Sequence, residues 1–157
     1  MDTDRLLKVV ERTASHGLAQ PDRAKWMLIW ACDICGELAE YIEEPSLEEA
    51  GDVLWGCGAI SLISGVPLPK WVNPLPMDDL TVLCGALKLL DHLKKVARDG
   101  LEHREVDEQL VRTTFATVLG YLKTKVNLDE AVSAVDIKLL KRYPCGYSAE
   151  SSVNRVI

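Results

Sequence analysis

Apolar residues recur along this chain at spacings of three and four positions, which is the pattern of a helix with one buried face. The pattern predicts helices over residues 3–16, 22–43, 46–64, 77–98, 104–124 and 128–142. No two segments show the alternation of apolar and polar residues that paired strands require. We therefore expect an all-α fold, a helical bundle of about six helices.

Capping residues mark several of the expected helix ends. Ser46, with Glu49 three residues later, has the spacing of a capping box at the start of the third helix. Gly65 is suited to end that helix, because glycine accepts the left-handed conformation of a C-cap. Pro21 is expected in the first turn of the second helix, where its missing N–H costs nothing.

A proline-rich connector, residues 66–77, separates two halves of what we expect to be a single domain, residues 1–157, with a tail at 143–157. The halves are faintly alike: "GELAEYI" in the first resembles "LKLLDHL" in the second, and "GDVLWG" resembles "ATVLGY". Two interpretations stay open, a decayed tandem repeat of a helix pair and a chance likeness of two amphipathic pairs. In a repeat, the second half would have lost most of its acids.

Clustered acids lie in the most apolar part of the chain. Residues 36–55 contain seven carboxylates and no basic residue. Asp33, Glu37 and Glu40 stand at positions i, i+4 and i+7, on one stripe of a helix whose other positions are nearly all apolar. A solvated acidic face explains the glutamates between the helices. It explains the stripe poorly, and we expect these three acids to be partly buried.

The next helix adds Glu49 and Asp52, again on one face. Partly buried like charges are costly unless a cation compensates them, and the chain has no Lys or Arg between Lys25 and Lys70. Sets made only of carboxylates suit hard divalent cations such as Mg²⁺ or Mn²⁺. The pattern therefore predicts a metal site for Mg²⁺, with Mn²⁺ as a substitute, between the two helices.

These acids also carry a family resemblance. "ELAE" followed by "EEAGDVLW" resembles the E-x-x-E … E-x-x-D signature of the MazG-like, all-α nucleoside triphosphate pyrophosphohydrolases, and the compact phage and bacterial members are the most similar type. The segment "KLLKRYPCGYSAESSVNR" resembles the frequent family ending K-L-x-x-R-Y-P-x-G-[FY]. The resemblance covers residues 26–71 well and residues 83–154 more loosely.

The resemblance implies hydrolysis of a (deoxy)nucleoside triphosphate to the monophosphate and pyrophosphate, with Mg²⁺ held by four acids. On this chain the four would be Glu37, Glu40, Glu49 and Asp52, and Glu37 or Glu40 would also orient the attacking water.

One departure concerns the segment "DICGE", residues 33–37, where many members read E-E-x-G-E. Ile34 then stands where a ligand is expected, and Asp33 or Glu40 would have to replace it.

Other residues have both a binding and a packing interpretation. Trp26, Trp30 and Trp55 could stack on a nucleobase or belong to the core. Lys138 and Arg142 could meet phosphates that the metal does not cover, or could be solvated. The resemblance to phage enzymes favours purine substrates, dGTP or GTP first. A pyrimidine-preferring enzyme for dCTP or dUTP and a non-catalytic, metal-binding oligomerisation module are the alternatives.

The cysteines indicate the compartment. Five scattered Cys, an odd number, and an N-terminus without a signal-like apolar stretch predict free thiols and a cytoplasmic protein. The C-x-x-C pair "CDIC", residues 32–35, lacks a second pair for zinc, so we expect buried free thiols there. No glycine-rich phosphate loop is present, which excludes a P-loop enzyme.

Charge and apolar patterning predict the partners. A net charge of −6 argues against a nucleic-acid or anionic-membrane partner, and no run reaches the roughly 18 uncharged residues of a membrane helix. The apolar faces around residues 53–64 and 110–122 should not both be buried within one chain. The family that the chain resembles forms dimers or tetramers, so we expect a homo-oligomer, a tetramer or a dimer.

Overall fold

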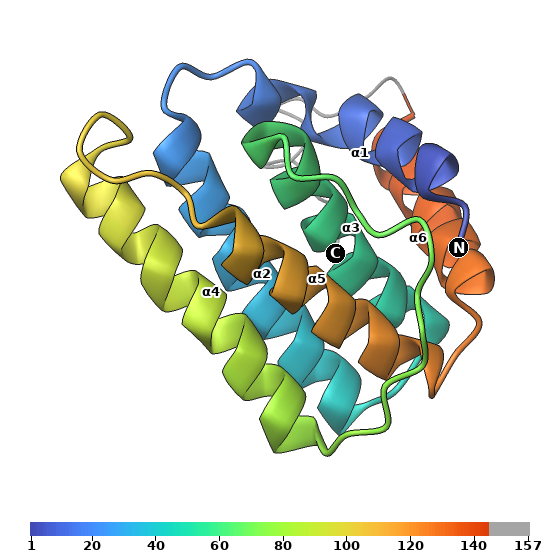
Figure 1. Ribbon diagram of the computed structural model, residues 1–157. Coiled ribbons are helices and arrows are strands. Elements are labelled where there is room, and N and C mark those ends of the chain that lie inside the picture. Colours follow the sequence, from blue (N-terminus) through green and yellow to red (C-terminus); the bar gives the residue numbers. More distant parts are fainter. Residues whose placement is uncertain (145–157) are drawn as a thin grey trace.

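Six α-helices make up the computed structural model, which describes residues 1–144 (Figure 1). Their bounds are α1 Thr3–Leu18, α2 Arg23–Glu43, α3 Leu47–Ser64, α4 Asp79–Asp99, α5 Glu108–Lys123 and α6 Leu128–Arg142. No strand occurs among these 144 residues. The prediction of an all-α bundle of about six helices is confirmed, whereas most of the predicted tail lies outside the described residues.

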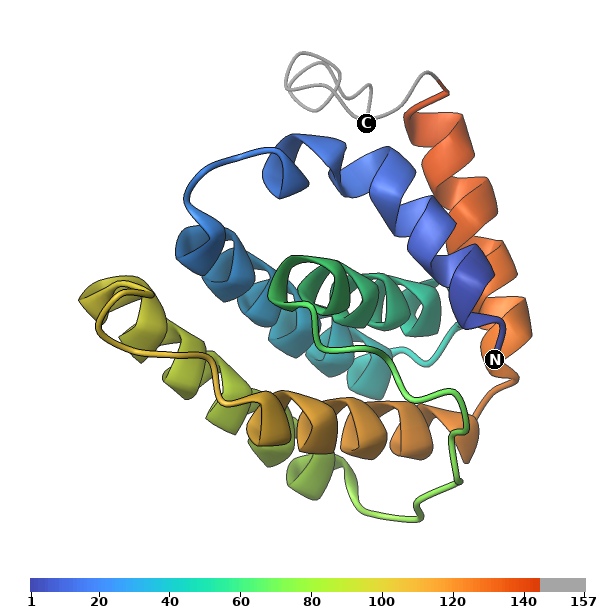
Figure 2. The same cartoon turned by 45° about the horizontal axis from the view of Figure 1, so that its top comes forward.

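The helices stack in three layers of two (Figure 2). The pair α2–α3 lies in the middle; α4 on α2 and α5 on α3 cover one face of the pair, and α1 and α6 pack against α3 on the other. Because α2 and α3 are joined by a short loop, they run antiparallel. The central pair is therefore shielded on both sides, and this pair carries the clustered acids.

Two glycines of α3 allow neighbouring helices to approach it closely. A Cβ atom at Gly56 would lie 2.7 Å from Cγ1 of Ile34 on α2, so only glycine permits this α2–α3 contact. A Cβ atom at Gly51 would lie 2.6 Å from the carbonyl oxygen of Ala131 and 2.7 Å from Cβ of Val135, both on α6. These contacts fix which turns of α2, α3 and α6 face one another.

Helix starts follow the capping residues, with two corrections. Ser46 caps α3 as predicted, since its hydroxyl accepts a hydrogen bond from the Glu49 N–H at 3.1 Å. Pro21 does not lie in the first turn of α2, because Asp22 is the N-cap and Pro21 precedes it. The fifth helix begins at Glu108, four residues later than predicted, because the side chain of Asp107 caps it.

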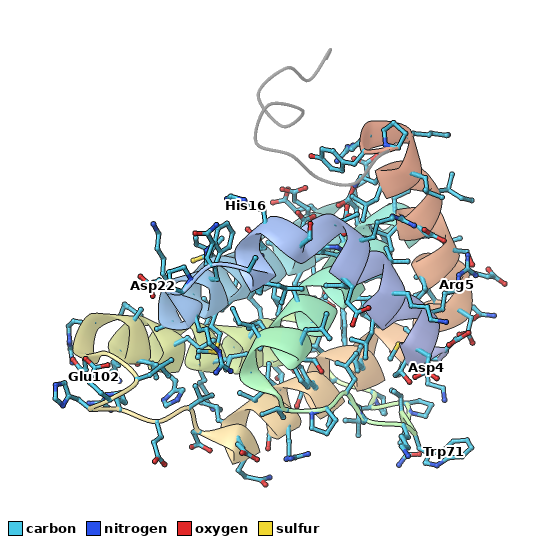
Figure 3. The ribbon with its side chains drawn as sticks, turned by 90° about the horizontal axis from the view of Figure 1, so that it is seen from above. Asp4, Arg5, His16, Asp22, Trp71 and Glu102 are labelled. Carbon is cyan, nitrogen blue, oxygen red and sulfur yellow. The ribbon has the colours of Figure 1, made fainter. Side chains whose placement is uncertain are left out.

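The connector between α3 and α4 is fixed to the surface of α5. The N–H of Leu75 donates to the carbonyl of Gly120 at 3.0 Å, and Nζ of Lys123 donates to the carbonyl of Val72 at 2.6 Å. The side chain of Trp71 stays 88% exposed and points away from the helices (Figure 3). The connector thus covers α5 while it presents one large aromatic side chain to solvent.

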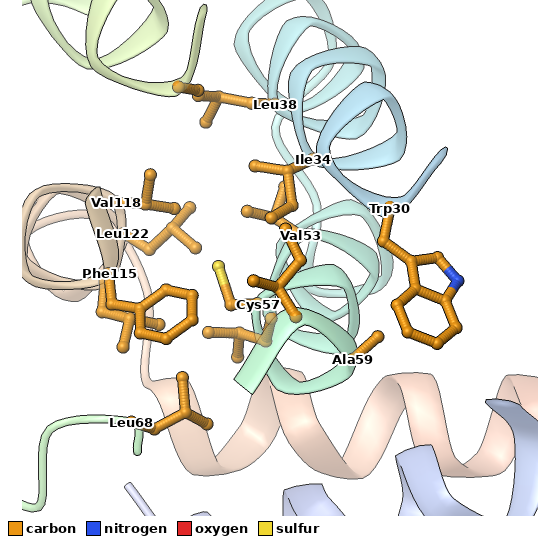
Figure 4. Packing of buried hydrophobic residues seen from close by; sticks show 14 of the residues in the cluster. Trp30, Ile34, Leu38, Val53, Cys57, Ala59, Leu68, Phe115, Val118 and Leu122 are labelled. Atoms are coloured by element: carbon orange, nitrogen blue, oxygen red, sulfur yellow. The ribbon is translucent and has the colours of Figure 1, made fainter. Parts of the chain in front are cut away.

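The apolar faces of α3 and α5 are both buried within a single chain. Ile60 and Phe115 are fully buried, and the connector adds Leu68 to the same core beside Phe115 (Figure 4). The expectation that one chain could not bury both faces is therefore wrong, because it left out the connector and α6. The homo-oligomer stays a prediction that rests on the family resemblance. None of the helices in residues 1–144 is both long and apolar enough for a membrane span.

Candidate metal and nucleotide site

Three predicted acids meet between α2 and α3. Glu37 of α2 and Glu49 and Asp52 of α3 each place a carboxylate oxygen within 4.8 Å of the others. All three are half-buried. Within residues 1–144 this is the group of carboxylate, imidazole or thiol side chains whose spacing suits a metal ion.

The packing of α2 on α3 explains why these acids converge. Ile34 and Gly56 are in contact, and the two helices run in opposite directions. One turn forward from Ile34 is Glu37, and one turn back from Gly56 is Asp52. The two carboxylates therefore face each other beside the same contact, and the first turn of α3 adds Glu49.

The charges of these acids oppose one another. Burial and, after it, the charges of Asp52, Glu40 and Glu49 together raise the pKa of Glu37 to about 7. Burial also raises the pKa of Asp52, against the lowering influence of Lys138. Carboxylates in such a setting resist ionisation until a cation compensates them. The cluster is therefore suited to bind one.

A cation from α6 already reaches the cluster. Nζ of Lys138 donates a hydrogen bond to Oδ2 of Asp52, and the two side chains are only 14% and 15% exposed. The positive charge of Arg142 also lowers the pKa of Asp52. The two predicted phosphate-binding residues thus lie at the acids. Sequence reasoning missed the pairing of Lys138 with Asp52, since these residues are 86 positions apart.

A pocket of about 330 Å³ opens beside the acids. Its acidic side is formed by Asp33, Glu37 and Asp52, and its aromatic side by three tryptophans. The other lining residues come from α1, α2 and the end of α6: Thr13, Ala14, Gly17, Ile29, Leu139, Arg142 and Tyr143. Carboxylates and indoles thus share one concave surface of the size that small-molecule sites have, about 300–1,000 Å³.

The three predicted tryptophans all line this pocket, but they differ in burial. Trp30 is 3% exposed and lies between Trp26 and Trp55, with ring centroids 5.6 and 6.3 Å away. Trp55 donates its indole N–H to the hydroxyl of Thr13 at 2.7 Å. Trp30 therefore belongs mainly to the core, whereas the partly exposed Trp26 and Trp55 can offer surface to a ligand.

Asp33 and Glu40 are more exposed than expected. Asp33 lies on the pocket side one turn before Glu37, and burial raises its pKa, but it is not part of the three-acid cluster. Glu40 lines a separate acidic hollow that it shares with Glu49. The expectation of partial burial is wrong for Glu40, whereas Asp33 is exposed overall but partly shielded where it lines the pocket.

The burial of Ile34 shows which way the side chain at this position faces, where many members of the MazG-like family have an acid. Ile34 is 1% exposed and packs into the core against Gly56, so a side chain at that position faces away from the acids. Asp33 is the neighbour that faces the pocket. A cluster built on positions 37, 49 and 52 therefore needs no ligand from position 34.

The side of the pocket that helix α1 forms was not predicted from the sequence. Gly17 lies so close to the tryptophans that a Cβ atom there would be 2.7 Å from Cζ2 of Trp30 and 2.8 Å from Cε3 of Trp26. Thr13 and Ala14 complete this wall. Helix α1 shows only an ordinary amphipathic pattern in the sequence, which gives no sign of the partner that its inner face covers.

The cysteines differ in part from the prediction. Cys32, Cys35, Cys57 and Cys84 are free, as predicted. Cys32 is exposed and Cys35 is only half-buried, so the expectation of a buried C-x-x-C pair is wrong. Burial raises the pKa of the Cys35 thiol to about 11, which disfavours a reactive thiolate. Cys145 lies outside the described residues.

We compared the chain with protein-family models, with curated proteins and with solved structures, and none of the three comparisons gives a match. The functional assignment therefore depends on the site itself. The fold and the site define an all-α protein with a three-carboxylate cluster next to an aromatic pocket.

Proposed function

We propose that this protein hydrolyses (deoxy)nucleoside triphosphates to nucleoside monophosphate and pyrophosphate, with Mg²⁺ as the cofactor and Mn²⁺ as a substitute. One observation carries the proposal: Glu37, Glu49 and Asp52 lie within 4.8 Å of one another at the edge of a pocket walled by tryptophans. The resemblance of the acid spacing to the MazG-like signature supports the same activity.

The donor set fits a hard divalent cation. All three ligands are carboxylates, which Mg²⁺ and Mn²⁺ prefer. Their ligand oxygens lie within 4.8 Å of one another, and opposite ligands of one Mg²⁺ ion are about 4.2 Å apart, so only a small adjustment would bring them onto one ion. Burial and mutual repulsion raise the pKa values of Glu37 and Asp52, so both gain from a cation.

Each group of the site has a place in the reaction. Glu37, Glu49 and Asp52 would hold Mg²⁺, which when bound neutralises phosphate charge and lowers the pKa of a water molecule. Glu37 or the nearby Glu40 would orient the attacking water and accept its proton. Lys138 and Arg142 would bind phosphate oxygens, as basic side chains at the pocket edge can do.

The order of residues along α2 favours attack at the α-phosphate. Trp26, Trp30, Asp33 and Glu37 follow one stripe, and Trp30 and Glu37 are separated by roughly 10 Å of helix rise. A base held at the tryptophans places the α-phosphate nearest to the acids, with the β- and γ-phosphates beyond it. Pyrophosphate is then the leaving group.

The proposed base preference is for purines, guanine first. Stacking on an indole does not choose between bases, because every base has a π-face. The alternative is a preference for dCTP or dUTP. The base is therefore to be decided by turnover rather than by the shape of the pocket.

The proposal is tested by pyrophosphate release from a panel of dGTP, GTP, dATP, dCTP and dUTP with saturating Mg²⁺ or Mn²⁺. We expect turnover that requires the metal, is abolished by a chelator, and is highest with dGTP or GTP. No pyrophosphate from any nucleotide would refute the activity. Faster turnover of dCTP or dUTP would refute only the purine preference.

One observation favours the second candidate, a non-catalytic metal-binding module that acts through oligomerisation. The ion pair of Lys138 with Asp52 compensates part of the acid cluster without any metal. For this candidate, light scattering would give a particle larger than one chain, and calorimetry would detect Mn²⁺ binding without turnover. The enzyme proposal predicts binding and turnover together, in a cytoplasmic protein that is also a homo-oligomer.

A further inference from the structure

The acid cluster contains a cation that the chain itself supplies. Lys138 donates from Nζ to Oδ2 of Asp52, and Asp52 is one of the three acids whose oxygens lie within 4.8 Å of one another. With side-chain exposures of 14% and 15%, this ion pair is largely removed from solvent. A pair so placed differs from a surface ion pair, whose partners exchange freely with water.

The approach of α6 to α3 explains how Lys138 reaches the acids. Ala131, Val135 and Lys138 lie at positions i, i+4 and i+7 of α6, on one stripe. The first two contact Gly51 at distances that exclude any side chain there. The third therefore faces the next residue of α3, Asp52.

Helix α1 holds α6 in this position from the other side. Arg12 and Arg5 form ion pairs with Asp136 at 2.9 and 3.3 Å. The backbone of α6 is thus fixed against both α1 and α3. The Lys138 side chain, by contrast, has four carbons between the backbone and the ammonium group, so it can leave Asp52 without any movement of the helix.

We propose that Lys138 is an exchangeable counter-ion that takes the place of the metal: its ammonium group and the divalent cation compete for Asp52, and metal binding releases the ammonium group toward the pocket. The inference rests on the proposed function only in requiring that the acid cluster binds a metal. Asp52 then exchanges one cation for another, and its charge is compensated in both states.

Competition follows from the charges. An ammonium group and a divalent cation on the same carboxylate repel each other strongly inside a partly buried site, where the effective dielectric constant is low. The ammonium group must therefore move when the metal binds. Once released at the pocket edge, beside Arg142, it is placed to bind a phosphate of the nucleotide, an anion that the acids alone would repel.

If Lys138 has a purely structural role, its removal should change the affinity for metal in the opposite direction. If the ion pair only held Asp52 in place, its removal would disorder the ligand and weaken the metal. If the ammonium group competes, its removal strengthens metal binding. The affinity of the protein for Mn²⁺ in the absence of nucleotide separates the two roles.

The test compares Lys138→Met with Lys141→Met, titrated with Mn²⁺ alone and followed by the electron paramagnetic resonance signal of free Mn²⁺. Lys141 is an exposed residue on the same helix outside the pocket lining, so its replacement removes the same charge without removing the ion pair. We expect Lys138→Met to bind Mn²⁺ about 10-fold more tightly than Lys141→Met. Equal or weaker binding, while the wild-type protein binds Mn²⁺, would overturn the inference and leave the proposed function standing.

A second measurement needs no variant and holds if Lys138→Met does not fold. Reductive methylation of the wild-type protein, read by mass spectrometry, reports the accessibility of each amine. We expect methylation of Lys138 to rise several-fold when Mn²⁺ is added, while that of Lys141 stays unchanged. Unchanged Lys138 methylation with bound Mn²⁺ would overturn the inference, and absence of Mn²⁺ binding in every protein would overturn both the inference and the metal site.

Discussion

The acids of α2–α3 and those of α4 are the same kind of side chain in opposite environments. On α4, Asp91 is about half exposed and forms ion pairs with Lys94 and Lys95 at 2.7 and 2.6 Å, which lower its pKa to about 2. In the central pair, burial and neighbouring acids raise the pKa of Glu37 to about 7, and burial raises that of Asp52. Asp91 therefore has two lysines of its own, whereas the three acids of the central pair share one lysine, Lys138, which pairs with Asp52.

The difference comes from local sequence and from the position of each helix in the stack. Asp91 has lysines three and four residues later on the same face of an outer helix. Glu37 has Glu40 and Tyr41 at those positions, on a helix of the central layer. An acid on a central helix without a basic neighbour on its own face is therefore the better candidate for a cation ligand.

The same comparison bears on the possible tandem repeat. In that interpretation Asp91 corresponds to Glu40, and Lys88 to Glu37. Asp91 and Glu40 are both acids, and Asp91 is about half exposed whereas Glu40 is exposed. Lys88 and Glu37 differ in charge, and Lys88 is exposed whereas Glu37 is half-buried. The repeat stays a prediction, and the structure describes two helix pairs of which only one gathers its acids.

The largest expected effect is on turnover, which should fall when an acid of the central pair is replaced but not when Asp91 is replaced. Glu49→Gln and Asp52→Asn keep the shape of the side chain but remove charge from the metal site, which contributes several kcal/mol to catalysis, so we expect turnover to fall by about 10³-fold or more. Asp91→Asn is the matched control and should change turnover by less than about twofold, the range of ordinary surface substitutions. Steady-state pyrophosphate release checks this, with circular dichroism to confirm folding. A comparable loss in Asp91→Asn would break the distinction between the two sets.

A smaller effect is expected on stability as a function of pH, and it has opposite signs for the two sets. In metal-free protein, the pKa of Glu37 is about 7 when folded and 4.5 when unfolded, so its favourable contribution is present below pH 4.5 and is lost as pH rises to 7. Asp91 has a folded pKa of about 2 against 3.8, so its contribution is present above pH 3.8 and is lost as pH falls to 2.

Replacing each acid by its amide shows whether its charge stabilises or destabilises the folded protein at a given pH. With a chelator at pH 8, we expect Glu37→Gln to be more stable than the wild-type protein by about 1 kcal/mol, or about 3 °C in Tm, after allowance for solvent screening. Asp91→Asn should be less stable than the wild type at that pH, and the difference should disappear as pH falls below 2. Thermal unfolding followed by circular dichroism gives both differences. A destabilised Glu37→Gln in chelator would show that Glu37 is not short of positive charge.

Much of the fold could be predicted, because helix periodicity and capping are local properties. The Ser46 cap and the end of α3 at Gly65 each depend on residues within one turn. The start of α5 was misplaced because residues 101–104 read as polar helix and form a turn instead, before the cap at Asp107. Errors of this kind concern where a helix begins rather than whether it exists.

The candidate site could be predicted only in part. The acids lie close together in the sequence, whereas the helices that cover them, α1 and α6, come from distant parts of the chain. Spacing along α2 and α3 was sufficient to bring Glu37, Glu49 and Asp52 together once the helices were antiparallel. The burial of Trp30 and the arrival of Lys138 depend on α1 and α6, which lie far away in the sequence. Their positions follow from tertiary contacts such as the α6 approach at Gly51, which no local pattern reveals.

The central claim is that the acids of α2 and α3 direct water to the α-phosphate of a nucleotide, and the most direct measurement follows the oxygen of that water. Hydrolysis of dGTP in ¹⁸O-labelled water, with Mg²⁺ present, is analysed by mass spectrometry of both products. Because the α-phosphate lies nearest to Glu37 and Asp52 in the proposed arrangement, we predict one ¹⁸O in the nucleoside monophosphate and none in pyrophosphate. Label in pyrophosphate, or orthophosphate as the first product, would contradict the account.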